Sequence, residues 1–182
     1  MLLSHDILDI CTHPEYVEPL HEEGWKKTAL YKMKLMDSFL KESQRVNPIT
    51  VASIARRVKK PIRLSDGTLL PRGAAVFPSP DVFDGRRFFA RRQLPGQENA
   101  WQLVTTSADH LDFGHGAHAC PGRFFAANEA KVAFAFLLIC YDWRFPAGVG
   151  ERPRNVEFDD QVAINPLAKV DFRRTGETLL VE

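Results

Sequence analysis

The sequence lacks several features that would indicate a secreted or nucleic-acid-binding protein. It has three cysteines among 182 residues, Cys11, Cys120 and Cys140, without the paired spacing of a disulfide framework. Such sparse cysteine usage fits a reducing compartment. Its 24 basic and 23 acidic residues leave a net charge of +1, so charge gives no reason to expect nucleic acid as a partner. The ordinary composition, 45% hydrophobic and 26% charged, predicts a single globular domain over residues 1–182.

Long apolar runs are also missing. The longest, Val132 to Cys140, is about half the length needed to cross a bilayer. At the beginning of the chain Leu3 is followed at once by Ser4, so no apolar core of a signal peptide forms. We therefore expect a cytoplasmic or peripheral chain without a transmembrane segment.

Apolar periodicity predicts a mainly α chain with small β-sheets, an α+β fold. Asp66-Gly67 lies between two short alternating runs and predicts a β-hairpin. The stretch from Ala90 to Thr106 is polar and reads as irregular. The predicted helices cover residues 2–12, a segment beginning at Pro14, 32–46 and 123–140, and further strands are expected at 141–145, 158–162 and 169–173.

The most distinctive stretch is the glycine-rich loop Phe113–Gly122, which reads FGHGAHACPG and precedes the longest helical pattern. Its glycines permit positive φ and a close approach of the backbone to a ligand. Pro121 suits the first position of a helix, which would put Cys120 at a helix N-terminus. There the helix dipole and free N–H groups favour a thiolate. A thiolate held by small residues, with room for a flat partner, suits a haem iron.

Other readings of Cys120 stay open at this point. A cysteine is often a small buried hydrophobe. A structural zinc site needs about four Cys or His ligands, whereas His118 is the one such residue close to Cys120 in a ligand-like spacing. A cysteine nucleophile needs a histidine base and an orienting group, and neither can be identified from the sequence.

The loop resembles the cysteine loop of the haem-thiolate monooxygenases, the cytochrome P450 family, whose pattern is Phe-x-x-Gly-x-Arg-x-Cys-x-Gly. Phe113, Gly116, Cys120 and Gly122 fill four fixed positions, and His118 replaces the arginine, as in fungal members. The resemblance implies that Cys120 is the axial ligand of a haem iron and its only metal ligand from the chain. It also implies that Phe113 packs beside the sulfur and that His118 takes the place of a propionate-binding arginine.

A second motif lies upstream. Glu42 and Arg45 are three apart on a predicted helix and would be surface neighbours, which alone would be a solvated salt bridge worth little. With Asn47-Pro48 behind it, the stretch resembles the Glu-x-x-Arg motif of the same family. Arg87 is the best match to the arginine that completes the family's network. The resemblance therefore implies a structural network of Glu42, Arg45 and Arg87.

The region between these motifs departs from the family in one respect. Arg57 matches by spacing an arginine that commonly binds a haem propionate, although an exposed basic strand end is an equal alternative. Gly73 and Pro80 are only seven apart, where the family usually places a strand and a short helix. A deletion or a mis-joined exon would both produce this spacing.

The resemblance covers only the C-terminal portion of the family, so residues 1–182 are expected to form a partial cytochrome P450 domain. The N-terminal part and the long central helix that activates oxygen are expected to be missing, and no catalytic residue is identifiable. The implied function is haem-dependent oxidation of an organic small molecule in fungal secondary metabolism, with electrons from an NADPH-dependent reductase. The expected location is cytoplasmic or peripheral to the endoplasmic reticulum, where full-length relatives are usually anchored. The alternative is a truncated, non-catalytic haem-binding remnant or interaction protein.

Overall fold

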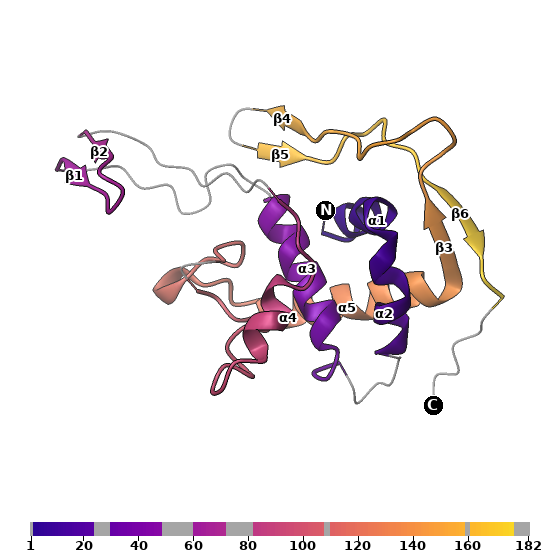
Figure 1. Ribbon diagram of the computed structural model, residues 1–182, viewed down its shortest axis with the longest axis horizontal. Coiled ribbons are helices and arrows are strands. Elements are labelled where there is room, and N and C mark those ends of the chain that lie inside the picture. The colour runs from indigo at the N-terminus through magenta and orange to yellow at the C-terminus, as the bar shows by residue number, and fades with distance from the viewer. Residues whose placement is uncertain are drawn as a thin grey trace.

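The computed structural model describes residues 2–23, 30–48, 60–71, 82–107, 110–158 and 161–176. Helices occupy the middle of the molecule, and three separate strand pairs lie around them (Figure 1). This arrangement confirms the predicted mainly α fold with small sheets. The helical elements are α1 Leu2–Thr12, η1 Pro14–Tyr16, α2 Val17–Glu22, α3 Lys34–Val46, α4 Arg87–Arg92, η2 Gly116–His118 and α5 Arg123–Cys140. The strands are β1 Ile62–Arg63, β2 Leu69–Leu70, β3 Tyr141–Arg144, β4 Val156–Phe158, β5 Gln161–Ala163 and β6 Asp171–Arg174.

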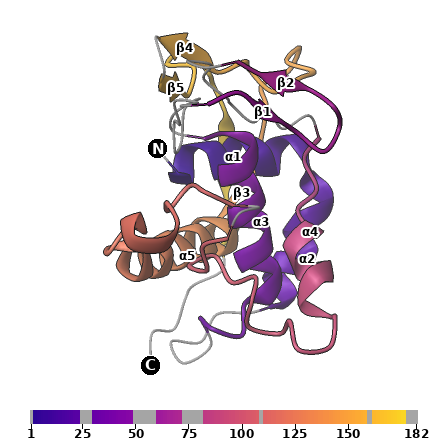
Figure 2. The same cartoon turned by 90° about the vertical axis from the view of Figure 1, so that its left-hand side faces the viewer.

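The hydrophobic core lies where α1, α2, α3 and α5 meet (Figure 2). Phe39 of α3 and Phe134 of α5 are both fully buried, and their rings stack with centroids 5.7 Å apart. Burying an aromatic or aliphatic side chain of this size contributes about 1.5–3 kcal/mol. The buried core consists mainly of aliphatic residues: Ile7, Ile10, Leu20, Met33, Leu35, Met36, Phe39, Leu40, Leu103, Ala127, Ala130, Phe134, Ala135 and Leu138.

Helix α5 carries the cysteine loop at its N-terminal end and is tied to the rest of the fold at its C-terminal end. The last carbonyls of a helix lack partners within the helix, and here other elements supply them. The Leu138 carbonyl accepts a hydrogen bond from Nε2 of His21 on α2 at 2.7 Å. The Leu137 carbonyl accepts one from Nε1 of Trp143, and the Ile139 and Cys140 carbonyls accept from Thr175. One end of α5 is thus fixed to α2, β3 and the residue after β6.

The strand pairs are all antiparallel: β1 with β2, β3 with β6, and β4 with β5. The predicted hairpin is confirmed, with Gly67 at φ 89° in its turn. The single strand predicted over residues 158–162 is wrong, because Phe158 and Gln161 are partners at the ends of two different strands. In the sequence two aspartates separate them, and aspartate is a turn former that the prediction ignored.

Helix α4 was not predicted, since residues 90–106 read as irregular. Its first turn is completed by Ser38, a buried residue of α3. The Ser38 hydroxyl accepts hydrogen bonds from the amides of Phe88 and Phe89, at 3.1 and 2.9 Å, and donates to the Gly85 carbonyl at 2.7 Å. This cap comes from a residue far away in sequence, so no local pattern could indicate it.

Candidate functional site

The cysteine loop is a compact turn whose backbone is bonded to itself. The Cys120 amide donates to the Phe113 carbonyl at 2.7 Å, which closes the loop at its two ends. Gly114 has φ 69°, and a Cβ placed there would lie 2.5 Å from the His118 carbonyl oxygen. Only glycine therefore fits at this position. Gly116 has φ 63°, with open space around it.

Cys120 lies just before α5, as expected, but two details of its neighbourhood differ from the prediction. The helix begins at Arg123, so Pro121 belongs to a turn and is not the first helical residue. Gly122 is the N-cap and has φ −84°, so it does not use the positive φ that glycine permits. A Cβ on Gly122 would come within 4.0 Å of the Cys120 sulfur. Glycine there keeps one side of the sulfur clear.

The loop suits the binding of a flat, apolar group through sulfur. Cys120 is a free, half-buried thiol, and no group of three or more potential metal ligands occurs among the described residues. A single sulfur donor beside a helix N-terminus fits a haem iron and does not fit a structural zinc ion. Phe124 and Phe125, which follow the loop in the first turn of α5, are 55% and 74% exposed and add apolar surface at this end of the helix.

The other residues expected around a haem are His118, Phe113 and Arg57, and they differ in burial and in whether the structure describes them. His118 is exposed in η2, two residues from Cys120. Phe113 is half-buried, and its packing on the hydrophobic core anchors the beginning of the loop. Arg57 lies outside the described residues.

The structure brings Glu42, Arg45 and Arg87 together. Glu42 has no exposed surface. It accepts hydrogen bonds from Arg45 at 2.7 and 2.8 Å and from Nε of Arg87 at 3.0 Å. The amide of Asp84 donates to the same carboxylate at 2.9 Å, and both arginines donate to the Val82 carbonyl. The hydrogen bond to Glu42 raises the pKa of Arg45. This network ties α3 to the segment that leads into α4.

Two buried ionic clusters were not predicted from the sequence. Asp37 of α3 lies 3.0 Å from both Arg92 of α4 and Lys131 of α5. Asp9 of α1 lies 2.7 Å from Arg152, which follows β3. Polar residues on helices are normally exposed, and the only available signal was their position on faces that also carry core residues.

A third cluster lies beside the entrance to the cysteine loop. Nε2 of His110 is 3.1 Å from Oδ2 of Asp112, and both residues lie near the side chain of Lys41. Burial, with the charge of Lys41 as a second cause, lowers the pKa of His110 to about 3. Burial raises the pKa of Asp112 to about 6, against the opposing charges of Lys41 and Arg45. His110 is therefore neutral at physiological pH.

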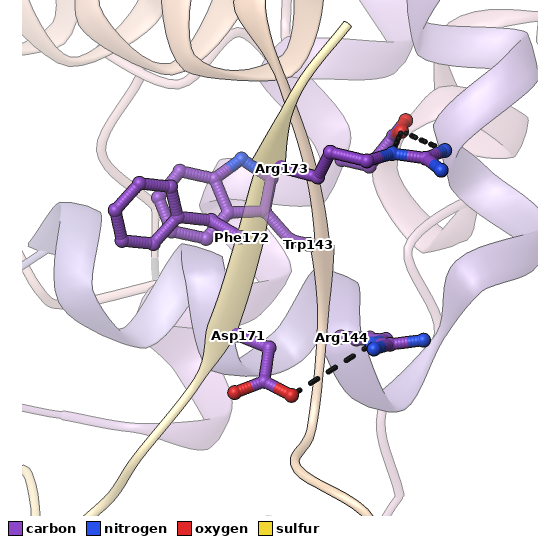
Figure 3. Close-up of a pocket in the computed structure, with 6 residues that line it drawn as sticks. Trp143, Arg144, Asp171, Phe172 and Arg173 are labelled. Carbon is purple, nitrogen blue, oxygen red and sulfur yellow. Dashed lines mark hydrogen bonds and ion pairs between the residues drawn. The ribbon is translucent and has the colours of Figure 1, made fainter.

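Among the open hollows of the described surface are two whose linings do not include Cys120. One, of about 270 Å³, lies along β3 and β6, where the rings of Trp143 and Phe172, tilted by 38° with centroids 5.6 Å apart, lie beside the Arg144–Asp171 ion pair (Figure 3). The other, of about 320 Å³, lies between the start of α3 and the start of α5, with Lys131 and Phe124 in its wall. Both are shallow surface features that do not involve the loop. Among the described residues, no helix is long and apolar enough to cross a bilayer.

Comparison with known proteins gives a consistent result. The family model described as Cytochrome P450 matches residues 3–171. Cytochrome P450 monooxygenase bsc2 of Alternaria brassicicola is 45% identical over 198 residues, which cover 97% of this chain and 38% of the relative. Cytochrome P450 monooxygenase BOA4 of Botryotinia fuckeliana is 42% identical, covering 94% and 39%. Cytochrome P450 monooxygenase TRI1 of Fusarium sporotrichioides is 40% identical, covering 96% and 36%.

The coverage also bears on chain length. The chain spans less than half the length of these relatives. Within the match to bsc2, 97% of 182 residues is about 177, roughly 21 fewer than the 198 aligned residues. The Gly73–Pro80 stretch, where one element is expected to be missing, lies outside the described residues. With its family match extending over most of its length, the chain belongs to the cytochrome P450 family.

Proposed function

We propose that this chain is the haem-binding portion of a monooxygenase, with Cys120 as the axial thiolate ligand of the iron. The observation that carries the proposal is the geometry of the loop: a free, half-exposed thiol next to the first turn of α5, held by a hydrogen bond from its own amide to the Phe113 carbonyl. The reaction would insert one atom of molecular oxygen into an organic small molecule.

Each residue of the loop has a distinct task in this proposal. Cys120 would hold the iron, and its place just before the N-terminus of α5 suits a thiolate ligand. Gly116 and Gly122 have no side chains, so a planar group can lie against the backbone of the loop. His118 would donate a hydrogen bond to a propionate, more strongly when protonated, and Arg57 would do the same with a bidentate guanidinium. When bound, the haem supplies the oxidising chemistry, which a thiolate ligand favours by pushing electron density toward the iron.

Glu42, Arg45 and Arg87 would have a structural task. Their network holds α3 against the segment before α4, and α3 packs directly on α5. It therefore fixes the helix that carries the cysteine loop without contacting the loop.

The partners and location follow from the family and are proposals for this chain. Electrons would come from an NADPH-dependent reductase, and the substrate would be an organic small molecule of fungal secondary metabolism. Three fungal relatives are named cytochrome P450 monooxygenases, which supports this reading. The proposed location is the cytoplasm or the cytoplasmic surface of the endoplasmic reticulum.

A spectroscopic experiment tests the ligand. The 182-residue chain is loaded with haem, reduced and exposed to carbon monoxide, and thiolate ligation is expected to produce a strongly red-shifted Soret band. Cys120→Ala should abolish the band. Cys11→Ala is the matched control, because Cys11 is another free, half-buried thiol that should not affect it. A band that persists in Cys120→Ala would refute the assignment.

Turnover is a separate measurement. The haem-loaded chain is combined with a reductase, NADPH and candidate substrates, and oxygenated product is measured by mass spectrometry. Thiolate ligation without turnover, beside turnover by a longer form of the protein, would favour the non-catalytic haem-binding alternative for the 182-residue chain.

A further inference from the structure

Lys41 is a fully buried lysine on α3, directly before Glu42. Within the part of the chain that the structure describes, it forms no ion pair with a carboxylate. Its Nζ donates instead to two main-chain carbonyls, Gln102 at 3.0 Å and Thr105 at 2.7 Å, and lies 5.2 Å from the ring centroid of Phe88. A buried amine without a direct ion pair is costly, and burial lowers the pKa of Lys41 to about 8 although the charges of Asp112 and Asp37 oppose the shift. The amine fixes the position of those two carbonyls.

The segment that Lys41 holds is a turn packed against the core. The Thr105 amide donates to the Gln102 carbonyl at 2.9 Å, so this carbonyl accepts from both the turn and Lys41. Leu103, between them, is 1% exposed. Lys41 and Leu103 together fix the turn to the helical core from two sides.

The same turn reaches the cysteine loop through Arg123, the first residue of α5. Nε of Arg123 donates to the Val104 carbonyl at 3.2 Å, and its Nη1 donates to the Cys120 carbonyl at 2.9 Å. A second contact joins Nδ1 of His115, in the loop, to Oγ1 of Thr106 at 3.3 Å. Hydrogen bonds at both ends of the Gln102–Thr105 turn, joined by the main chain of the turn itself, therefore connect α3 to the main chain of Cys120.

We propose that Lys41 is a positioning residue for Cys120, acting through the Gln102–Thr105 turn and Arg123. In its relation to haem this inference rests on the proposed ligand role of Cys120. It differs from the role of Glu42, which binds Arg45 on its own helix and, outside α3, the Asp84 amide and Arg87. Lys41 thus fixes the chain just before the cysteine loop, whereas Glu42 fixes it before α4.

Hydrogen exchange of the haem-free chain tests the positioning directly. Lys41→Met keeps the apolar stem and removes the donors. We expect exchange of the Cys120 amide and of residues 102–106 to become about tenfold faster or more, since exchange reports local opening and tenfold corresponds to about 1.4 kcal/mol. Lys131→Met is the control for the loss of a buried lysine, because Lys131 is also buried and donates to the Leu30 carbonyl, but unlike Lys41 it also pairs with Asp37. Equal acceleration in both variants, or none at Cys120 in Lys41→Met, would overturn the proposal.

Arg123→Met tests the connection from its other end and does not depend on the folding of Lys41→Met, because Arg123 is only half-buried. Exchange of the Cys120 amide should accelerate while the turn at 102–105, still held by Lys41, keeps its protection. If exchange of the Cys120 amide is unchanged in Arg123→Met, Arg123 does not connect the turn to Cys120 and the proposal is refuted.

A spectroscopic readout separates this inference from the proposed function. After haem loading and carbon monoxide treatment, the share of the red-shifted Soret band should fall several-fold in Lys41→Met. Lys41→Arg should recover part of it, because a guanidinium can still donate to both carbonyls. Normal exchange and a full band in Lys41→Met would refute the positioning role and leave the ligand assignment intact. Accelerated exchange in Lys41→Met, with no band even in the unaltered chain, would refute the ligand assignment and retain the positioning of Cys120.

Discussion

Removing the carboxylate of Glu42 is expected to be among the most destabilising single changes in this chain. Glu42 has no exposed surface, and its two oxygens accept from Arg45, Arg87 and the Asp84 amide. Glu42→Ala would leave two guanidinium groups without their shared anion. Breaking a buried ion pair by removing one partner costs about 3–5 kcal/mol.

The expected value lies near the lower limit of that range. The side chains of Arg45 and Arg87 keep 22% and 34% of their surface exposed, so water can solvate part of their charge once Glu42 is gone. We expect a loss of about 3 kcal/mol, which corresponds to a fall in Tm of about 6–12 °C for a domain of this size. Glu42→Gln keeps the shape and one acceptor oxygen and should cost less, about 1.5–3 kcal/mol.

Thermal unfolding followed by circular dichroism gives the measurement. Asp142→Asn is the control, because it removes a carboxylate from an exposed ion pair with Arg173, where the two side chains are 52% and 85% exposed. Such pairs contribute at most about 1 kcal/mol. If Glu42→Ala lowers Tm no more than Asp142→Asn does, the network is not the structural element inferred from its geometry.

Three further predictions concern other described residues. Gly114→Ala should reduce haem loading and lower the free energy of unfolding by about 1–3 kcal/mol, because its Cβ would meet the His118 carbonyl. Gly116→Ala, with similar φ but open space around the Cβ, should lower it less. Equal free energies of unfolding for the two variants would contradict the steric argument. The His110 pKa of about 3 lies below the usual 6.5, so the unfolded chain binds more protons between these values and stability falls as pH is lowered through that window. His110→Gln should therefore reduce the loss of Tm between pH 6.5 and 4.5. The raised pKa of Asp112 acts in the opposite direction in both forms of the protein. An unchanged dependence of Tm on pH in the variant would refute this prediction. Asp37→Asn would leave two buried cations without a carboxylate and should lower the free energy of unfolding by about 3 kcal/mol in denaturant titrations; a change under about 0.5 kcal/mol would show that they find other partners.

Much of the secondary structure could be predicted because its signals are local. Asn47-Pro48 ends α3 within one residue of the expected position, and Asp66-Gly67 places the turn of the β1–β2 hairpin. Pro48 fixes its own φ and disfavours the helical conformation at Asn47, whereas Asp66 and Gly67 tolerate the backbone angles of a tight turn. No tertiary information is needed to read these signals.

The remainder depends on contacts between distant residues. The N-terminus of α4 is satisfied by Ser38, and no sequence window contains both partners. Lys41 reads as a solvent-exposed helix residue, and only the assembled fold brings the Gln102 and Thr105 carbonyls to its amine. The family pattern predicts Cys120 as a ligand, but Arg123, which binds the Cys120 carbonyl, lies outside that pattern.

Adjacent positions on one helix, Lys41 and Glu42, hold the chain at Gln102 and at Asp84. The stretch between these two points is a closed loop with both ends fixed to the same turn of α3. Lengthening such a loop has only a small entropic cost, about 0.6 kcal/mol for each doubling. Insertions at its exposed turn near Gly96 can therefore accumulate without moving Cys120. In evolution, the turn near Gly96 is free to vary in length while α4 and the cysteine loop keep their places.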